Sequence, residues 1–356
     1  MSRAPASREV KRRLAIAARR LGTANPAESI NGLLDRTFEL PMNDPRYGNN
    51  ALIPESMPLE HSFAETAVDS LRLDLEPLGP DATPLSRRNE ANREMRRLVH
   101  QNFGTPALHW FDKNSENWRG MQIPGDANFG AFFGAAYNHN GLREAKVYYE
   151  LNPSDIEALP PNLKHAARVA QATLPNLVPL FASIGCSQQR GSIRIYFTHR
   201  GELRLLDLEP LMHRLGVGHQ LPGLLSAIGL ITGGRFTLPE NAVLIGIRDT
   251  TRGLELKLDI LIPGIPDPPK QMHGLIQMHL AQRPASLRAL RNWIQAMTPD
   301  NYTTCGSISV VSARVTPSTA TRLTVYFRPI GYEVRHNDVS STHANDPYLL
   351  NQLAVS

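Results

Sequence analysis

The chain has 356 residues, a formal net charge of +5 and a hydrophobic content of 41%, with no unusual excess of any residue class. These values are typical of a globular protein, and barrels of this length fold as one unit, so we expect a single domain. No apolar run approaches the roughly 18 residues that suggest a membrane span, which predicts that this is not a membrane protein.

Much of the positive charge lies in the first twenty residues, between Arg3 and Arg20. The stretch from Ser7 to Leu21 has the pattern of an amphipathic helix. An organelle presequence is also rich in arginine, but the low serine content and Glu9 favour a solvated first helix. We therefore expect a helical N-terminal segment over residues 5–35. The polar ends, residues 1–7 and 336–356, are predicted to be disordered tails.

The next segments alternate between strand and helix. Residues 71–77 are predicted as a strand, 86–100 as a helix and 107–112 as a further strand. Two apolar alternating runs, 129–137 and 144–151, flank the turn Asn138-His-Asn-Gly141, which indicates a hairpin. Residues 154–184 follow as a helical stretch interrupted by prolines, with Gly185 closing it.

The same unit of helix and hairpin continues to the end of the chain. Because it recurs about five times at intervals of roughly 50 to 75 residues, the repeats are too long for common solenoids and too antiparallel for a barrel of single alternating strands and helices. The later elements are hairpin 192–198 with 202–208, helix 211–231, hairpin 242–248 with 254–262, helix 271–297 divided near Pro284, and hairpin 305–315 with 322–330.

Hairpins joined by helices fit an α+β fold in which a ten-stranded antiparallel β-barrel is surrounded by α-helices, with about five ααββ-type repeats. We expect the barrel repeats to span residues 55–335 within a domain of residues 1–335. Several strands carry a lysine, arginine or tyrosine at every second position, so these side chains share one face and the intervening Leu, Ile and Val share the other. The clearest runs begin at Arg72, Lys146, Arg194, Lys257 and Thr324.

If the strands close into a barrel with helices outside, the polar set converges in the lumen. Such an arrangement is costly unless a charged ligand occupies it. The alternative is that these residues are exposed on a half-solvated sheet, the commonest reason for alternation in antiparallel sheets.

Several motifs resemble the dimethylallyltryptophan synthase family of aromatic prenyltransferases, whose fold is the αββα barrel. The segment from Met57 to Ser62, with Glu60 at its centre, resembles the family's Pro-x-Glu-x-Ser signature, and residues 71–78 resemble its strand with Arg followed by Glu-Pro. Lys146 with Tyr148 is similar to its Lys-x-Tyr strand, Arg194 with Tyr196 to its basic-x-Tyr strand, and residues 256–259 to a strand of bacterial members. The resemblance covers roughly residues 55–332.

The resemblance implies transfer of a prenyl group, with dimethylallyl expected, from a prenyl diphosphate to an electron-rich ring, with the indole of tryptophan or a related compound as the expected acceptor. Cations must then receive the diphosphate, tyrosine faces must shield the carbocation, and a carboxylate must accept the indole N–H. The implied diphosphate ligands are Arg72, Lys146, Arg194, Lys257 and Arg248; the shield is Tyr148, Tyr196 and Tyr326; the catalytic residues are Glu60 and Lys146, which could also accept the ring proton.

One departure from the family is Ser192, which stands where a further arginine is common, so this phosphate contact is expected either to be missing or to be supplied elsewhere, for example by Arg248. The sequence has no Asp-Asp-x-x-Asp motif, which favours direct cationic binding of diphosphate without an obligatory Mg²⁺ or other cofactor. Cys186 and Cys305 lie far apart without zinc spacing, and no secretory segment is evident, so a cytoplasmic protein is expected.

The expected partners are two small-molecule substrates, with neither nucleic acid nor membrane, and the chain is expected to be a monomer or homodimer. Three alternatives stay open at this point. The acceptor is instead a phenol or a peptide-borne ring with a longer prenyl donor; the protein is a non-catalytic basic module that binds nucleic acid; or the barrel has lost catalysis and carries an apolar ligand.

Overall fold

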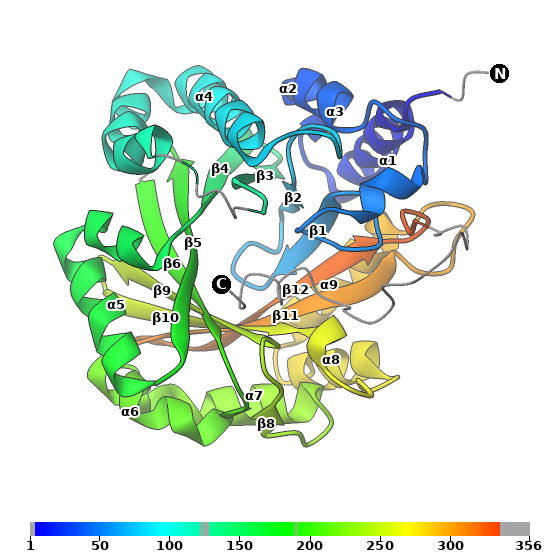
Figure 1. Ribbon diagram of the computed structural model, residues 1–356. Coiled ribbons are helices and arrows are strands. Elements are labelled where there is room, and N and C mark those ends of the chain that lie inside the picture. The colour runs from blue at the N-terminus through cyan, green and yellow to red at the C-terminus, as the bar shows by residue number, and fades with distance from the viewer. Residues whose placement is uncertain (1–3, 122, 124–127, 189–190, 335–356) are drawn as a thin grey trace, which may run out of the picture.

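The computed structural model describes residues 4–121, 123, 128–188 and 191–334. Ten antiparallel strands close into a barrel, and helices surround it (Figure 1). The barrel order is β1-β12-β11-β10-β9-β6-β5-β4-β3-β2. Its strands are β1 (Leu59–Ala64), β2 (Leu71–Leu75), β3 (Ala131–Asn138), β4 (Gly141–Glu150), β5 (Leu177–Ser187), β6 (Gly191–His199), β9 (Val243–Thr250), β10 (Gly253–Leu261), β11 (Gly306–Thr316) and β12 (Thr319–Pro329).

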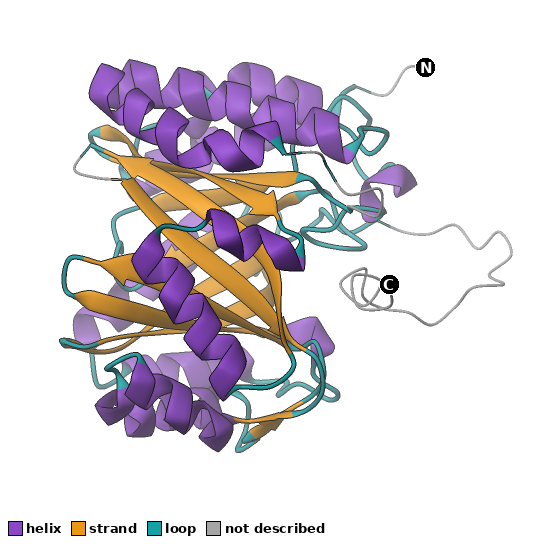
Figure 2. Cartoon of the chain, turned by 60° about the vertical axis from the view of Figure 1, so that its left-hand side comes forward, coloured by secondary structure: helices purple, strands orange, loops and turns teal. Residues whose placement is uncertain are grey.

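Helices connect successive hairpins on the outside, so the strands lie between helical layers (Figure 2). A small separate sheet pairs β7 (Leu203–Arg204) with β8 (Thr237–Leu238). The α-helices are α1 (Ala6–Leu21), α2 (Pro26–Ser29), α3 (Asn31–Thr37), α4 (Pro84–Gly120), α5 (Pro161–Thr173), α6 (Glu209–Arg214), α7 (Leu221–Ile231), α8 (Met272–Leu280) and α9 (Pro284–Met297).

The hydrophobic core lies between the barrel and its helices rather than at the barrel axis. Outward residues of the strands, such as Val147, Ile195 and Leu258, are fully buried. Helix α4 packs on β3, β4 and β5, while α7 packs on β11 and β12. Because this shell takes up the apolar face of each strand, the opposite face is left to form the barrel interior.

The predicted ten-stranded barrel is confirmed, and so are the hairpins predicted within residues 129–151, 242–262 and 305–330, but the predicted hairpin partner of β6 was wrong. Residues 177–187 form strand β5, which pairs with β4 and β6, and not the end of a helix. Helix α5 ends at Thr173, and Asn176 turns the chain with φ 69°. Gly185 is therefore a strand residue. The run looked helical because β5 has small or apolar residues on both faces, so no polar alternation marked it.

Two further expectations were wrong. Of the predicted strand 202–208, only Leu203 and Arg204 are extended, and they pair with β8. Residues 107–112 belong to the second arm of α4, which bends where Gly104 adopts φ 82° and ψ 178°. Phe111, Ser115 and Trp118 are the buried residues of this arm, a helical spacing that a six-residue window does not reveal.

The ends of the chain also differ from expectation. Ala6 and Ser7 are not part of a tail: they begin α1 and are buried, because the amide of Ala6 bonds the Leu40 carbonyl and that of Ser7 bonds the Phe38 carbonyl. The predicted tail at 336–356 lies outside the described residues. Within the described part of the chain, no helix combines the length and apolarity needed to cross a membrane.

Candidate active site

The predicted site residues all project from the barrel strands toward the interior. Cross-strand register places them on one face of the sheet: Arg72 lies opposite Ser62, Lys146 opposite Gly134 and Lys257 opposite Gly246. Contacts between strands that are not neighbours confirm that this face is the inside, because Lys257 of β10 donates to the hydroxyl of Tyr326 on β12. The exposed-sheet alternative for these residues is therefore wrong.

The inward residues come from most of the barrel strands. Glu60 is on β1, Arg72 on β2, Lys146 and Tyr148 on β4, Arg194 and Tyr196 on β6, Arg248 on β9, Lys257 on β10 and Tyr326 on β12. The barrel thus brings together residues that are far apart in sequence.

The interior cations are paired with carboxylates that the sequence reasoning did not assign to the site. Glu144 lies 3.0 Å from the Lys146 ammonium and 3.9 Å from the Arg72 guanidinium. Asp259 lies 2.9 Å from the Lys257 ammonium. Their signal was present in the sequence, because each is two residues from a predicted cation and so must share its face.

Glu255 contacts more of these interior cations than Glu144 or Asp259 does. It pairs with Arg194, lies 2.6 Å from Arg248 and lies 3.6 Å from Arg314, a cation that the sequence reasoning missed. Burial opposes ionisation of Glu255, but Arg194, Arg248 and Arg314 outweigh it and lower its pKa. Six cations surround three carboxylates in this part of the interior, so a net positive charge remains: Arg72, Lys146, Arg194, Arg248, Lys257 and Arg314 around Glu144, Glu255 and Asp259.

Two arginines retain unused donors. Among the described residues, the Nε atoms of Arg194 and Arg248 are buried without a hydrogen-bond partner. A buried donor without a partner costs free energy, so these groups favour an anion that supplies acceptor oxygens. Ser192, where a further arginine was expected, is two residues before Arg194 on β6. Arg248 lies directly opposite Arg194 on the neighbouring strand β9.

Aromatic rings lie directly beside the cations. The Lys257 ammonium is 5.5 Å from the centre of the Tyr196 ring and 5.1 Å from that of Tyr326. Tyr148 lies 6.4 Å from Tyr196 between ring centres, and Phe181 lies 4.5 Å from Tyr196. Such ring faces attract positive charge through their quadrupole, and a cation beside them contacts a ring in place of a water molecule that could attack it.

Glu60 lies in a different environment from the other acids. It is buried, 7% exposed, and accepts a hydrogen bond from Ser309 at 3.1 Å. Burial, with a further contribution from Asp74, raises its pKa to about 8. A carboxyl group with this pKa changes its protonation state near neutral pH, which is typical of groups that take part in binding or proton transfer at a functional site.

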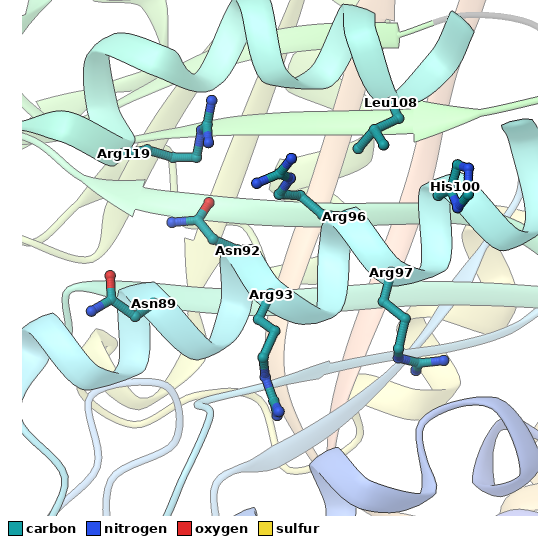
Figure 3. A pocket seen from close by; sticks show the side chains of 8 residues that line it. All are labelled: Asn89, Asn92, Arg93, Arg96, Arg97, His100, Leu108 and Arg119. Carbon is teal, nitrogen blue, oxygen red and sulfur yellow. The ribbon is translucent and has the colours of Figure 1, made fainter. Parts of the chain in front are cut away.

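A second concentration of positive charge lies outside the barrel, between the two arms of α4 (Figure 3). This groove of about 600 Å³ is lined by Arg93, Arg96, Arg97, His100, Arg119, Asn89, Asn92 and Leu108. Its arginines are already paired, because Arg93 and Arg97 contact Glu94, and Arg96 and Arg119 contact Asp112. No Phe, Tyr or Trp is among these eight residues, so the stacking faces that single-stranded nucleic acid requires are missing from this groove.

No protein-family model and no curated protein matches the chain. Solved structures do match. The 6-dimethylallyltryptophan synthase of Micromonospora olivasterospora, in complex with DMASPP and Trp, is 17% identical with a TM-score of 0.73 over 93% of this chain and 99% of that one. The prenyltransferase PriB, in a ternary complex with L-tryptophan and dimethylallyl thiolodiphosphate, is 18% identical with a TM-score of 0.67 over 93% and 98%.

A third match, the 5-dimethylallyl tryptophan synthase of Streptomyces coelicolor in complex with DMASPP and Trp, is 14% identical with a TM-score of 0.65 over 96% of this chain and 100% of that one. The chain therefore has the αββα barrel fold of these prenyltransferases, as the motifs predicted. Because the identities are low, the likeness establishes the fold, and the activity must be argued from the interior of this barrel.

Proposed function

We propose that the protein transfers a prenyl group, with dimethylallyl as the expected group, from a prenyl diphosphate to an electron-rich aromatic ring, with the indole of tryptophan or a tryptophan-derived compound as the expected acceptor. The observation that carries this proposal is that an excess of buried positive charge, a group of aromatic faces and a carboxyl group of raised pKa all face the same closed barrel interior. The ligands bound in the similar structures support it.

In the first step the bond between the allylic carbon and the diphosphate oxygen breaks, and the oxygen keeps the electron pair. The departing group carries several negative charges, which preorganised cations stabilise most strongly in a site with little water. We assign this role to Arg72, Lys146, Arg194, Arg248 and Lys257. Arginine can grip two phosphate oxygens at once, whereas lysine acts as a point charge.

In the second step a ring carbon of the acceptor attacks the allylic cation, and that carbon then loses its proton. We assign Tyr148, Tyr196 and Tyr326 to shielding the cation from water. Ionised Glu60 accepts the indole N–H hydrogen bond and stabilises the positive charge that develops on the ring. Lys146 is the proposed acceptor of the ring proton: its ammonium first passes a proton to the departing diphosphate, and burial, which lowers the pKa of Lys146, favours the neutral amine that then takes the ring proton.

Metal independence is part of the proposal. The charge that Mg²⁺ supplies in other prenyl-transferring enzymes is available here from side chains, since the interior cations exceed the carboxylates paired with them. Among the described residues, no three His, Cys, Asp or Glu side chains gather as a metal site.

Mass spectrometry of reaction products tests the function. Purified protein is incubated with dimethylallyl diphosphate and a panel of indoles, tyrosine and simple phenols, with geranyl diphosphate as a longer donor. A mass increase of one prenyl unit on an indole supports the proposal, and transfer to a phenol alone would replace the acceptor class. Absence of transfer to every acceptor, with the diphosphate recovered intact, would contradict the proposed activity.

A further inference from the structure

The Asp74 side chain lies in space that a glycine on the neighbouring strand leaves free. Asp74 faces the barrel interior from β2, directly opposite Gly134 on β3 and Glu60 on β1. A Cβ atom at position 134 would lie 2.2 Å from the Asp74 Oδ1 atom. Only the absence of a side chain there lets the carboxylate extend across β3, so Gly134 and Asp74 form one structural unit.

Across β3 the Asp74 carboxylate meets Tyr148 on β4. The Tyr148 hydroxyl donates a hydrogen bond to Oδ1 at 3.2 Å. The same absent Cβ at Gly134 would lie 3.3 Å from the Tyr148 ring, so the ring also uses the space above this glycine. Burial, followed by the charge of Asp74, raises the pKa of Tyr148 well above its usual value, so the hydroxyl keeps its proton and stays a donor.

This contact fixes the direction of a ring in the aromatic group. Tyr148 stands edge-on to Phe181, with ring centres 5.9 Å apart, and lies beside Tyr196. A tyrosine ring swings about its χ1 bond, and a hydrogen bond at the hydroxyl end restrains that movement and so fixes where the ring lies. Asp74 therefore acts on this aromatic group through Tyr148.

We propose that Asp74 is a positioning residue, which holds the Tyr148 ring over the path of the allylic cation so that water cannot reach it, with Gly134 providing the space. This inference rests on the proposed prenyl transfer. When the ring is released, water attacks the cation through its oxygen and loses a proton to the surroundings. The products are then a prenyl alcohol and diphosphate in place of the prenylated acceptor.

The test is the ratio of prenyl alcohol to prenylated acceptor formed by each variant. Asp74→Ala and Tyr148→Phe each remove the hydrogen bond, and each should raise the ratio about fivefold, the effect of losing one ordinary hydrogen bond. The double variant should give a ratio close to that of either single variant, because both act through one contact. Asp74→Asn keeps a carbonyl oxygen in place and should restore most of the parental ratio.

Gly134→Ala gives a second approach, since the added methyl group displaces the carboxylate without deleting it, and it should raise the ratio in the same direction. Gly274→Ala is the matched control, because a Cβ there meets no atom within 4 Å. Thermal unfolding of each variant identifies loss of folded protein, which lowers both products together and leaves their ratio unchanged.

The outcomes separate the two proposals. If the parent protein transfers no prenyl group to any acceptor, the proposed function fails and the inference fails with it. If the parent transfers the group, while Asp74→Ala and Tyr148→Phe keep the parental ratio or the double variant shows the product of the two single effects, then only the role of Asp74 is overturned.

Discussion

Arg194 and Arg248 lie directly opposite each other on β6 and β9, and Glu255 contacts both guanidinium groups. Like charges opposite each other in a sheet are destabilising unless a counter-charge lies between them. Glu255 supplies that charge, and it is only 3% exposed. The arrangement resembles an anion site in which the Glu255 carboxylate is already the bound anion.

Glu255→Gln should lower the thermal stability of the protein, because three arginines lose their shared counter-charge. Inorganic pyrophosphate should then raise the unfolding midpoint of the variant by more than that of the parent, since it binds the folded state where the negative charge was removed. Thermal unfolding with and without pyrophosphate measures both effects. An equal shift in parent and variant would show that pyrophosphate does not bind at this cluster.

Glu60→Gln should reduce turnover about a hundredfold, as expected when a charge-stabilising carboxylate becomes neutral. In the parent, kcat/KM should rise as the pH passes through about 8, because burial raises the pKa of Glu60 to that value and the ionised form is the active one. The variant should lack this rise. Steady-state kinetics between pH 6 and pH 9 checks both statements, and a parent profile that falls over this range would contradict the role of Glu60.

The raised pKa of Glu60 also predicts how the free energy of unfolding depends on pH. The folded pKa of about 8 is above the ordinary value of 4.5 for a glutamate, so folding favours the protonated form. The contribution of Glu60 to stability is thus fully present below pH 4.5 and is lost as the pH rises to about 8, by about 1.4 kcal/mol per pH unit in between. Urea unfolding of parent and Glu60→Gln over this range measures it. A constant difference between the two proteins would show that the pKa is not raised.

Gly246 is predicted to be required for activity although it carries no side chain. A Cβ at this position would lie 3.0 Å from both the Arg194 Cδ atom and the Tyr196 ring. Gly246→Ala should therefore displace a diphosphate ligand and a shield residue together, raising KM for the prenyl diphosphate and lowering kcat. Gly120→Ala, at the end of α4, is the control because a Cβ there meets nothing within 4 Å. Parental kinetics in Gly246→Ala would place the substrate elsewhere.

Turnover should persist in the presence of excess chelator. Side-chain cations supply the charge that the departing diphosphate needs, so removing free Mg²⁺ should leave kcat unchanged within experimental error. The comparison is a single preparation assayed with chelator and with added Mg²⁺. Complete loss of activity that Mg²⁺ restores would overturn metal-independent binding.

The sequence determined most of the strands and which of the candidate site residues share a face, because strand alternation is a local property. Lys146 and Tyr148, or Arg194 and Tyr196, share a face whatever the strand pairs with. The hairpin at Asn138 to Gly141 was also predictable, since turn residues define it within a few positions. These features required no knowledge of distant contacts.

Tertiary structure alone decided the rest. Strand β5 has no polar alternation, and it is a strand because β4 and β6 supply its hydrogen bonds on both sides. The roles of Glu255 and Asp74 depend on which strands become neighbours: Glu255 reaches arginines on β6 and β9, and Asp74 reaches Tyr148 only across Gly134. Alternation fixes which face a side chain occupies, but register and barrel closure fix which charges meet there.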